Sequence, residues 1–403
     1  MIIVVREKKK GVSMKGGLRE FAMMGLLMSA VLLSGCGSVP NDNNKPDAAI
    51  NEESLSSIVC QGMVSKDSKF DSANINYSQA EFEELGFELG DSVNLSFSNG
   101  YSMEDLPYYN GYYVRYGGAV LVAYPGFDSV AVTYNCAGIW EKADLSDGMA
   151  FTITLNEKGK YKNIQESLGQ IYSFVREDYS SDEEFCNYRA CSGGKLKSDF
   201  IYRGASPVDN SRGRAAYTDG LLKASKVGRI VDLADSKEDI VKYRAMEDYA
   251  SAYTDELLDR GNVILLNMGS SYRSDEYKKS IADGLREIIA SDEPVYIHCM
   301  EGKDRTGFVC MLIEALSGAS YDEMLKDYMI TYDNYYSINQ TDSPETYDKI
   351  TDIYFNEFME YLHGAASVEE LKTSDYTEAA KNYLLEGGMT ETEIEALINT
   401  LTI

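Results

Sequence analysis

The chain has 403 residues, a length that suggests two or three domains. Of these residues 44% are hydrophobic and 26% charged, which is typical of a folded protein. Its formal net charge of -27 at pH 7 excludes a general role in binding nucleic acid or anionic lipid, because such a surface repels polyanions. Only a local basic pocket would attract a phosphate group to this molecule.

The first 35 residues predict an export signal. A basic stretch through Arg19 precedes an apolar run at residues 21–33, which has the length of a signal-peptide core and is short for a membrane span. The following LSGC ends at Cys36 and resembles the bacterial lipobox, in which the cysteine is lipidated and begins the mature protein. We therefore expect a lipid anchor on the extracytoplasmic face of the cell membrane; a plain secretory leader or an uncleaved anchor is the alternative. Residues 36–57 would form a flexible tether, since they are rich in Asn, Pro, Ser and acidic residues.

Residues 58–162 predict a β-rich domain. Short apolar and aromatic runs alternate with Gly, Asn and Asp, as in DSVNLSFSNGY and SVAVTYNCAGIW, which indicates a barrel or a sandwich. The region has no recognisable carboxylate pair or metal-ligand cluster. We therefore expect it to bind a partner or act as a spacer, and leave its role open.

Residues 163–403 predict a mixed α/β domain. Buried strands are expected at residues 227–235, 261–268 and 293–299, and helices at residues 274–291 and 305–318. Towards the C-terminus, SVEE from Ser367 and TETE from Thr390 are helix-start signatures, and the EGG at residues 386–388 should end a helix between them. These last helices are expected to be structural.

The segment HCMEGKDRTG, residues 298–307, joins a predicted strand to a predicted helix. Backbone N–H groups of a tight loop, together with a helix N-terminus, form a concave site for anions. A cysteine at its mouth, Cys299, would have its thiolate form stabilised there. Arg305 supplies a planar fork for two phosphoryl oxygens, while Gly302 lets the backbone come close and Gly307 permits close helix packing.

This Cys-x5-Arg-Thr pattern with a preceding His resembles the signature of cysteine-dependent phosphatases of the protein tyrosine phosphatase superfamily. The resemblance implies an α/β domain in which Cys299 is the nucleophile and Arg305 binds the phosphoryl group. It also implies that Thr306 assists breakdown of the phosphoenzyme and that His298 orients the loop. The residues expected to line the phosphate site are Met300, Glu301, Gly302 and Lys303. The chemistry needs no metal or organic cofactor, and the cysteine clusters have no His partners for a zinc site.

Two residues are candidates for the acid that protonates the leaving group. Better-known tyrosine phosphatases carry an Asp on a separate loop about 30 to 35 residues before the cysteine, but the interval around Asn267 has no Asp or Glu. HCxxGKDRTG resembles a bacterial branch in which the Asp within the loop is the proposed general acid. We therefore prefer Asp304 to Asp275, which lies at a predicted helix start.

The resemblance extends loosely over residues 163–401. DFIYRGASPVDNS, residues 199–211, resembles the entry segment of the same family. The next strand usually ends in Asp-Leu-Arg, but here Asp232 and Leu233 are followed by Ala234. Any role of that arginine is therefore lost or moved to Arg203 or Arg212.

Three functions remain open. We expect a surface-tethered phosphatase for phosphotyrosine-type monoesters of proteins. A phosphoinositide or inositol-phosphate phosphatase of the same chemistry is the alternative, to which Lys303 adds some support, and a non-catalytic phosphate-binding receptor is the alternative from another class. An export signal would also permit disulfides between Cys60 and Cys136 and between Cys186 and Cys191, although free thiols fit the sequence equally well.

Overall fold

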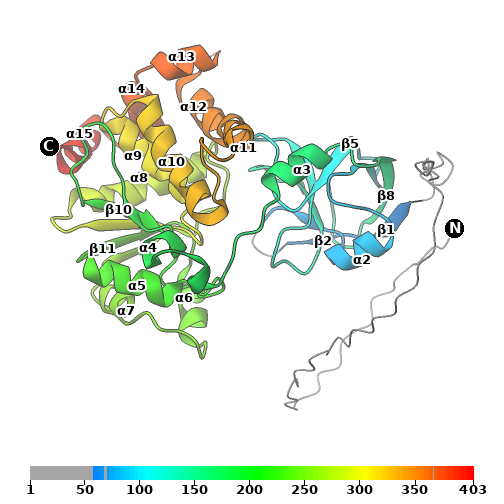
Figure 1. Cartoon of the computed structure of the whole chain (residues 1–403), viewed down its shortest axis with the longest axis horizontal. Helices are drawn as coiled ribbons and strands as arrows, with labels where there is room; N and C mark the ends of the chain where they lie inside the picture. Colours follow the sequence, from blue (N-terminus) through cyan, green and yellow to red (C-terminus); the bar gives the residue numbers. More distant parts are fainter. Residues whose placement is uncertain (1–57, 68–69, 366) are drawn as a thin grey trace, which may run out of the picture.

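The computed structural model describes residues 58–67, 70–365 and 367–403. They form two domains joined by helix α3 (Lys162–Leu168) and linker residues 169–175 (Figure 1). The predicted signal peptide, Cys36 and the tether lie outside the described residues. None of the helices in this described part has the length and apolar character that a membrane span requires.

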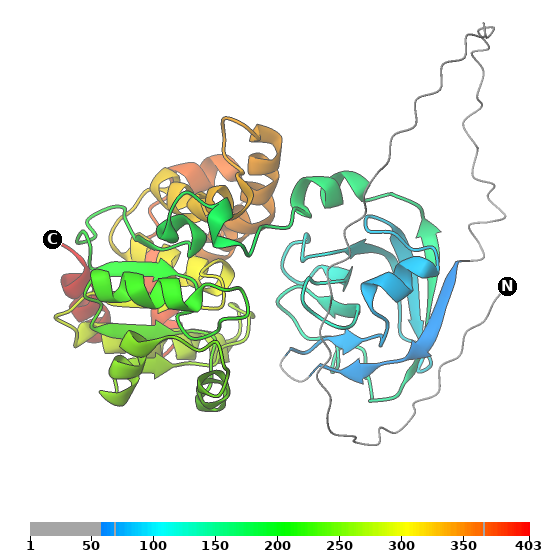
Figure 2. The ribbon, with the colours of Figure 1, turned by 60° about the horizontal axis from the view of Figure 1, so that its bottom comes forward.

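The first domain, called the β domain here, is an eight-stranded sheet formed by described residues from 58 to 157 (Figure 2). Its two edge strands follow each other in the chain with only Val64 between them, so the edges of the sheet meet. Of the two architectures expected for this region, the structure has the barrel, curled around one hydrophobic core. The short helix α2 (Gln79–Glu84) contributes Phe82 to that core and begins with a capping box at Ser78. The strand order is β1 (Val59–Met63), β8 (Ala150–Glu157), β4 (Ser92–Phe97), β5 (Ser102–Tyr109), β6 (Ala119–Val122), β7 (Ala131–Tyr134), β3 (Ala73–Asn74), β2 (Ser65–Lys66).

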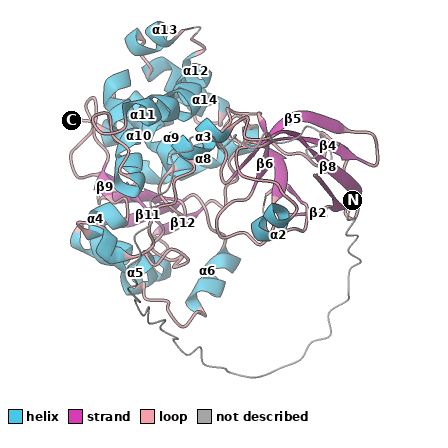
Figure 3. Ribbon diagram, turned by 45° about the vertical axis from the view of Figure 1, so that its right-hand side comes forward, coloured by secondary structure: helices cyan, strands magenta, loops and turns pink. Residues whose placement is uncertain are grey.

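The second domain, called the α/β domain, contains a five-stranded mixed sheet flanked by helices, which confirms the predicted class (Figure 3). The strand order is β12 (Val263–Leu265), β11 (Arg229–Asp232), β13 (Val295–His298), β10 (Ile201–Gly204), β9 (Arg189–Ala190). Neighbouring strands are parallel except at the β9 edge. Helices α5 (Ala215–Ala224), α6 (Lys237–Arg244) and α7 (Ala252–Asp259) lie on one side, and α8 (Asp275–Ile289), α9 (Asp304–Leu316) and α10 (Tyr321–Tyr336) on the other (Figure 1). Two short helices, η1 (Arg176–Asp178) and α4 (Asp182–Phe185), precede the sheet.

Both faces of this sheet are buried, which explains why its strands lack polar alternation. In β13, Val295 and Ile297 belong to the core shared with α8, α9 and α10, whereas Tyr296 belongs to the core on the opposite face. The carboxyl ends of three parallel strands then meet. His298 is paired with Gly204 of β10 on one side and with Asp232 of β11 on the other. The loop after His298 therefore starts at the middle of this edge.

The C-terminal helices pack against α8, α9 and α10. They are α11 (Pro344–Ile350), η2 (Thr351–Phe355), α12 (Asn356–His363), α13 (Val368–Thr373), α14 (Thr377–Glu386) and α15 (Glu391–Leu401). The predicted signals are confirmed: Ser367 and Thr390 are the N-caps of α13 and α15, and α14 ends at Glu386. Gly388, two residues on, has a φ of 90°, a conformation that favours glycine.

Glu357 of α12 is the central residue of the junction between the two domains. Its carboxylate accepts the N–H of Tyr116 from the β domain at 3.1 Å, and also pairs with Arg273. The Arg273 guanidinium in turn lies 4.1 Å from the centroid of the Tyr116 ring. Beside this cluster, Arg115 of the β domain donates to Glu360 at 2.7 Å.

Candidate active site

The strand–loop–helix predicted from HCMEGKDRTG is present. β13 ends at His298, and α9 begins at Asp304, one residue before the expected start. All nine predicted site residues from His298 to Thr306 therefore lie on one short segment. A Cβ on Gly307 would lie 3.1 Å from the Tyr328 ring, so the small residue lets α9 pack closely against α10.

The backbone carbonyls of the loop point away from its concave side, because the surrounding domain binds them. A peptide group carries its N–H opposite its C=O, so the loop N–H groups face the concave side, next to the N-terminus of α9. Among the hydrogen bonds of the described residues, no backbone oxygen accepts the N–H of Met300, Glu301 or Gly302. The carbonyl contacts are Ser206 N–H to Met300 (3.0 Å), Tyr335 O–H to Glu301 (2.8 Å), and Arg203 Nη2 and Asn187 Nδ2 to Gly302 (2.9 and 3.2 Å).

Arg203 is the main buried support of the loop. It is 1% exposed, and its second nitrogen, Nη1, donates to Asp327 at 2.6 Å. Arg189 donates to the same carboxylate at 2.8 Å. Burial disfavours the charge on Arg203, but Asp327 and the other acidic groups around it together keep the pKa of Arg203 above its ordinary value. Arg203 and Arg212, the two candidates for the displaced arginine, both contact the loop: Arg212 Nε lies 3.7 Å from the Glu301 carboxylate.

Gly302 is required by its conformation and by its neighbour. Its φ is 66°, a region that disfavours residues with a Cβ. A Cβ there would lie 2.3 Å from the carbonyl carbon and oxygen of Gly204. The loop can therefore pack onto the end of β10 only with glycine at this position.

His298 and Asp232 form a buried contact beneath the loop, and each is 1% exposed. His298 Nδ1 lies 3.2 Å from the Cys299 carbonyl, which can only accept, so Nδ1 carries the proton. Its Nε2 faces Asp232 Oδ2 at 3.8 Å. Burial lowers the pKa of His298 to about 4 and raises that of Asp232 to about 6. His298 is thus neutral at physiological pH, and its ring is held against the backbone of the cysteine.

Cys299 directly follows β13, and Arg305 and Thr306 lie in the first turn of α9. The cysteine is 4% exposed and is a free thiol. Arg305 Nη1 donates to the carbonyl of Met268 at 2.9 Å. The Thr306 hydroxyl is fully buried and has no hydrogen-bond partner among the described residues. Met268 lies 31 residues before Cys299, in the interval where better-known tyrosine phosphatases carry the Asp that acts as general acid. In this structure the same interval provides the backbone carbonyl that binds Arg305.

The two candidate acids lie in different surroundings. The Asp304 side chain, at the first position of α9, is 60% exposed, and Lys303 Nζ lies 3.3 Å from its Oδ1. Burial disfavours the charge on Lys303, but Asp304 and the tyrosines around it keep the pKa of Lys303 above its ordinary value. Asp275 is exposed in the first turn of α8, directly after the N-cap Ser274.

The loop has supports that the sequence did not reveal. Asn187, Tyr335 and Tyr172 come from three separate segments, and the Tyr172 hydroxyl donates to the Glu301 carboxylate. These residues are far from the loop in the sequence, so the sequence did not reveal the contacts; of the residues that contact the loop, it pointed only to Arg203 and Arg212, as positions for the displaced arginine. The six cysteines of the described residues, including the four for which pairing was considered, are all free thiols.

The profile of a family described as "Tyrosine phosphatase family" matches residues 184–403, more than half of the chain. The chain belongs to this tyrosine phosphatase family. The match includes the loop and Arg203, leaves the β domain outside, and supports phosphatase activity, that is, a hydrolase.

Among solved structures, a cysteine-to-serine variant of P. aeruginosa TpbA in complex with pTyr is 16% identical and has a TM-score of 0.27. That comparison covers 48% of this chain and 88% of the other. A second structure of P. aeruginosa TpbA is also 16% identical, with a TM-score of 0.22 and coverage of 57% and 94%. Among curated proteins, no match was found.

Proposed function

We propose that the protein is a surface-tethered phosphatase that hydrolyses phosphotyrosine-type monoesters through a phosphocysteine formed on Cys299. The observation that carries this proposal is the loop itself: its carbonyls are bound from outside, so its N–H groups converge beside a cysteine at a helix N-terminus. Such a site stabilises both the thiolate and the phosphoryl oxygens.

Arg305 holds the substrate phosphate. The Met268 carbonyl anchors one end of its guanidinium, which leaves the other N–H groups for two phosphoryl oxygens. In the first step the Cys299 thiolate attacks phosphorus, a P–S bond forms and the P–O bond to the leaving group breaks. Asp304 gives its proton to the departing oxygen.

The second step hydrolyses the phosphocysteine. Asp304, now a carboxylate, takes a proton from water, the water oxygen attacks phosphorus and the P–S bond breaks. The Thr306 hydroxyl donates to the sulfur as it leaves; a buried hydroxyl without a partner in the described structure supports this role. His298 does not react. It positions the Cys299 backbone through its Nδ1 proton.

Cys36 would carry the lipid that holds the enzyme on the extracytoplasmic face, since the LSGC motif directly precedes the tether. A phosphoinositide substrate is the second candidate, because Lys303 adds a positive charge at the mouth of the loop.

The test is phosphate release by residues 58–403 under reducing conditions, wild type beside Cys299→Ser, at pH 5 to 7. The panel contains a phosphotyrosine peptide, a phosphoserine peptide, phosphoinositides and inositol hexakisphosphate. Turnover of the phosphotyrosine peptide that the substitution abolishes is the expected result. Turnover that survives in Cys299→Ser would refute the phosphocysteine, and no turnover of any substrate by folded wild type would favour a phosphate-binding receptor.

Asp304→Asn and Asp275→Asn separate the two candidate acids. We expect Asp304→Asn to lower kcat by about 10²–10⁴-fold on the phosphotyrosine peptide, and much less on an aryl ester whose leaving group needs no proton. Asp275→Asn should leave both rates unchanged. The opposite pattern would assign the role to Asp275.

A further inference from the structure

Three segments of the β domain contact residues that neighbour the phosphate loop, the name used here for residues 299–303. The first contact runs through Arg212, whose Nε lies 3.7 Å from the Glu301 carboxylate and whose Nη2 donates to the Pro125 carbonyl at 3.4 Å. A Cβ on Gly126 would lie 3.3 Å from the same guanidinium. The Pro125 carbonyl and the Glu301 carboxylate are therefore bridged by a single arginine side chain, and Tyr124 is the residue before Pro125.

The second contact runs through the tyrosines around Lys303. The ammonium lies 5.9 Å from the centroid of the Tyr332 ring, which stacks on Tyr354 at 6.4 Å. The Tyr354 hydroxyl donates to the backbone carbonyl of Tyr112 in the β domain at 3.1 Å. The next residue, Tyr113, packs against the core of the α/β domain as well as against its own.

The third contact lies on the side of the arginine. Ser271 donates its hydroxyl hydrogen to the Cys136 carbonyl of the β domain. It follows Met268, the residue that holds Arg305, on the same loop after β12. The β domain thus touches the neighbours of Glu301, of Lys303 and of Arg305, and lies beside the mouth of the loop.

From this placement we propose that the β domain forms one wall of the catalytic cleft and that Tyr124 and Tyr113 bind the leaving group of the substrate. The occupant is an aromatic ring, so the wall selects aryl phosphate esters, phosphotyrosine above all, over alkyl phosphates. This inference rests on the proposed function, because it concerns the substrate of the same site.

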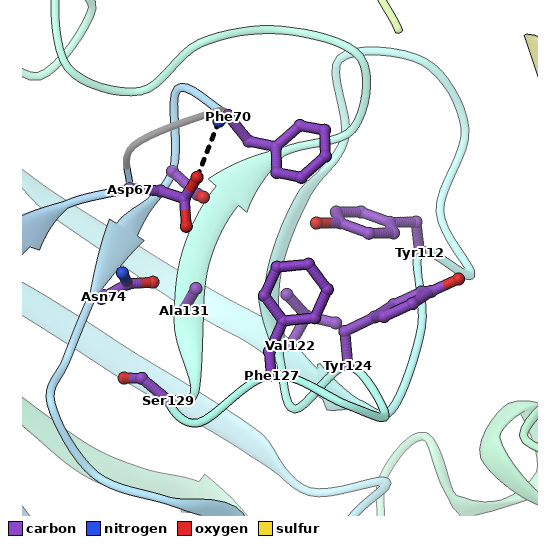
Figure 4. A pocket seen from close by; sticks show the side chains of 10 residues that line it. Asp67, Phe70, Asn74, Tyr112, Val122, Tyr124, Phe127, Ser129 and Ala131 are labelled. Carbon is purple, nitrogen blue, oxygen red and sulfur yellow. Dashed lines mark hydrogen bonds between the residues drawn. The ribbon is translucent and has the colours of Figure 1, made fainter. Parts of the chain in front are cut away.

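The character of the two side chains supports this assignment. Glu301 is the largest cause that raises the pKa of Tyr124, ahead of burial, and Lys303 opposes the burial that raises the pKa of Tyr113 to about 12. Electrostatic effects fall with distance, which agrees with the contacts of Tyr112, Pro125 and Gly126 that place this part of the β domain next to the neighbours of the loop. Tyr124 also packs against Tyr112 and Phe127, with ring centroids 5.8 and 5.7 Å away, and Figure 4 shows the three side chains gathered in one aromatic cluster. Such a surface binds a ring by offset or edge contacts.

Tyr124→Ala tests the wall by steady-state kinetics of residues 58–403. We expect KM for a phosphotyrosine peptide to rise about three- to tenfold, the effect of one aromatic contact. Inhibition by inorganic phosphate, which probes the loop alone, should stay within twofold. Tyr124→Phe keeps the ring and should behave as wild type. Tyr101→Ala is the matched control, since this β-domain tyrosine bonds to Tyr134 at 2.6 Å and has no contact with the loop among the described residues.

Three results would overturn the inference. An unchanged KM in Tyr124→Ala would show that the ring does not meet the substrate. A parallel loss of phosphate inhibition, or an equal loss in Tyr124→Phe, would assign Tyr124 a structural role. Wild type that fails to hydrolyse the phosphotyrosine peptide contradicts the proposed function itself, whereas active wild type with an unaffected Tyr124→Ala contradicts only the wall.

Discussion

Gly302→Ala tests the close contact between β10 and the loop of residues 299–303. The substitution has two separate costs. At a φ of 66°, alanine is disfavoured by about 1–2 kcal/mol relative to glycine. The new Cβ would also lie 2.3 Å from the Gly204 carbonyl carbon and oxygen, and relieving such an overlap costs about 1–3 kcal/mol. The overlap is with backbone rather than with the end of a flexible side chain, so the loop must move.

Gly318→Ala is the control for the first cost alone. Gly318 follows the other end of α9 with a φ of 79°, and nothing lies within 4 Å of a Cβ placed there. We therefore expect Gly302→Ala to lower the free energy of unfolding by about 2–5 kcal/mol, and Gly318→Ala by about 1–2 kcal/mol. The difference between the two variants measures the overlap with Gly204.

Urea unfolding followed by far-UV circular dichroism reports the helices, which lie mainly in the α/β domain. Trp140, the single tryptophan, is buried in the β domain, so its fluorescence follows that domain separately. A loop displaced by about 1 Å should lower kcat by about 10²-fold, with Gly318→Ala close to wild type. Equal unfolding free energies for the two variants, with activity retained in Gly302→Ala, would refute the reasoning.

Three further predictions concern buried and surface charges. Asp327→Asn leaves Arg203 buried without a carboxylate, and urea unfolding should show a loss of about 3–5 kcal/mol; a loss under 1 kcal/mol would contradict the pairing. Between pH 4 and 6, Asp232 carries a proton in the folded state that it lacks in the unfolded chain, whereas His298 lacks a proton that it carries in the unfolded chain. The two residues therefore have opposite effects on the pH dependence of the unfolding free energy, and these effects cancel. Asp232→Asn removes only the effect of Asp232, so the unfolding free energy of this variant should rise relative to that of wild type by about 2–3 kcal/mol from pH 4 to 6. A difference between the two proteins that does not change with pH would refute the raised pKa of Asp232. Arg115→Ala breaks an exposed pair at the junction and should cost under about 1 kcal/mol; a larger loss would mean that this pair holds the domains together.

The strand, loop and helix around Cys299 could be predicted because the sequence signals for them are local. A buried strand, a glycine and a helix start follow one another here, and the structure moves each predicted boundary by only one or two residues: the strand covers Val295–His298 and the helix Asp304–Leu316. The same holds for the caps at Ser367 and Thr390, where one side chain bonds to a backbone N–H three residues on. Patterns of this kind need no knowledge of the rest of the chain.

The supports of the loop could not be predicted, since they depend on long-range packing. Asn187 lies more than 100 residues before Gly302, yet its amide binds the Gly302 carbonyl only because β9, β10 and α10 bring the segments together. The abundant tyrosines were also ambiguous. Strand packing accounts for those such as Tyr108, but Tyr172 and Tyr335 stack on each other and both bond to Glu301 of the loop. Composition alone cannot separate these two uses.

Arg305 is important for the proposed function because the chain as a whole is strongly negative. In a molecule with a net charge of -27, a dianionic phosphate must find a positive charge that no carboxylate already neutralises. Three cations near the loop have acidic partners: Arg203 with Asp327 (2.6 Å), Arg212 with Glu301 (3.7 Å) and Lys303 with Asp304 (3.3 Å). Arg305 differs, because the partner of its guanidinium is the neutral Met268 carbonyl, and within the described residues no carboxylate forms an ion pair with it. The arginine without an acidic partner therefore lies on the same strand–loop–helix segment as Cys299, which supports the proposal that a phosphate group binds there.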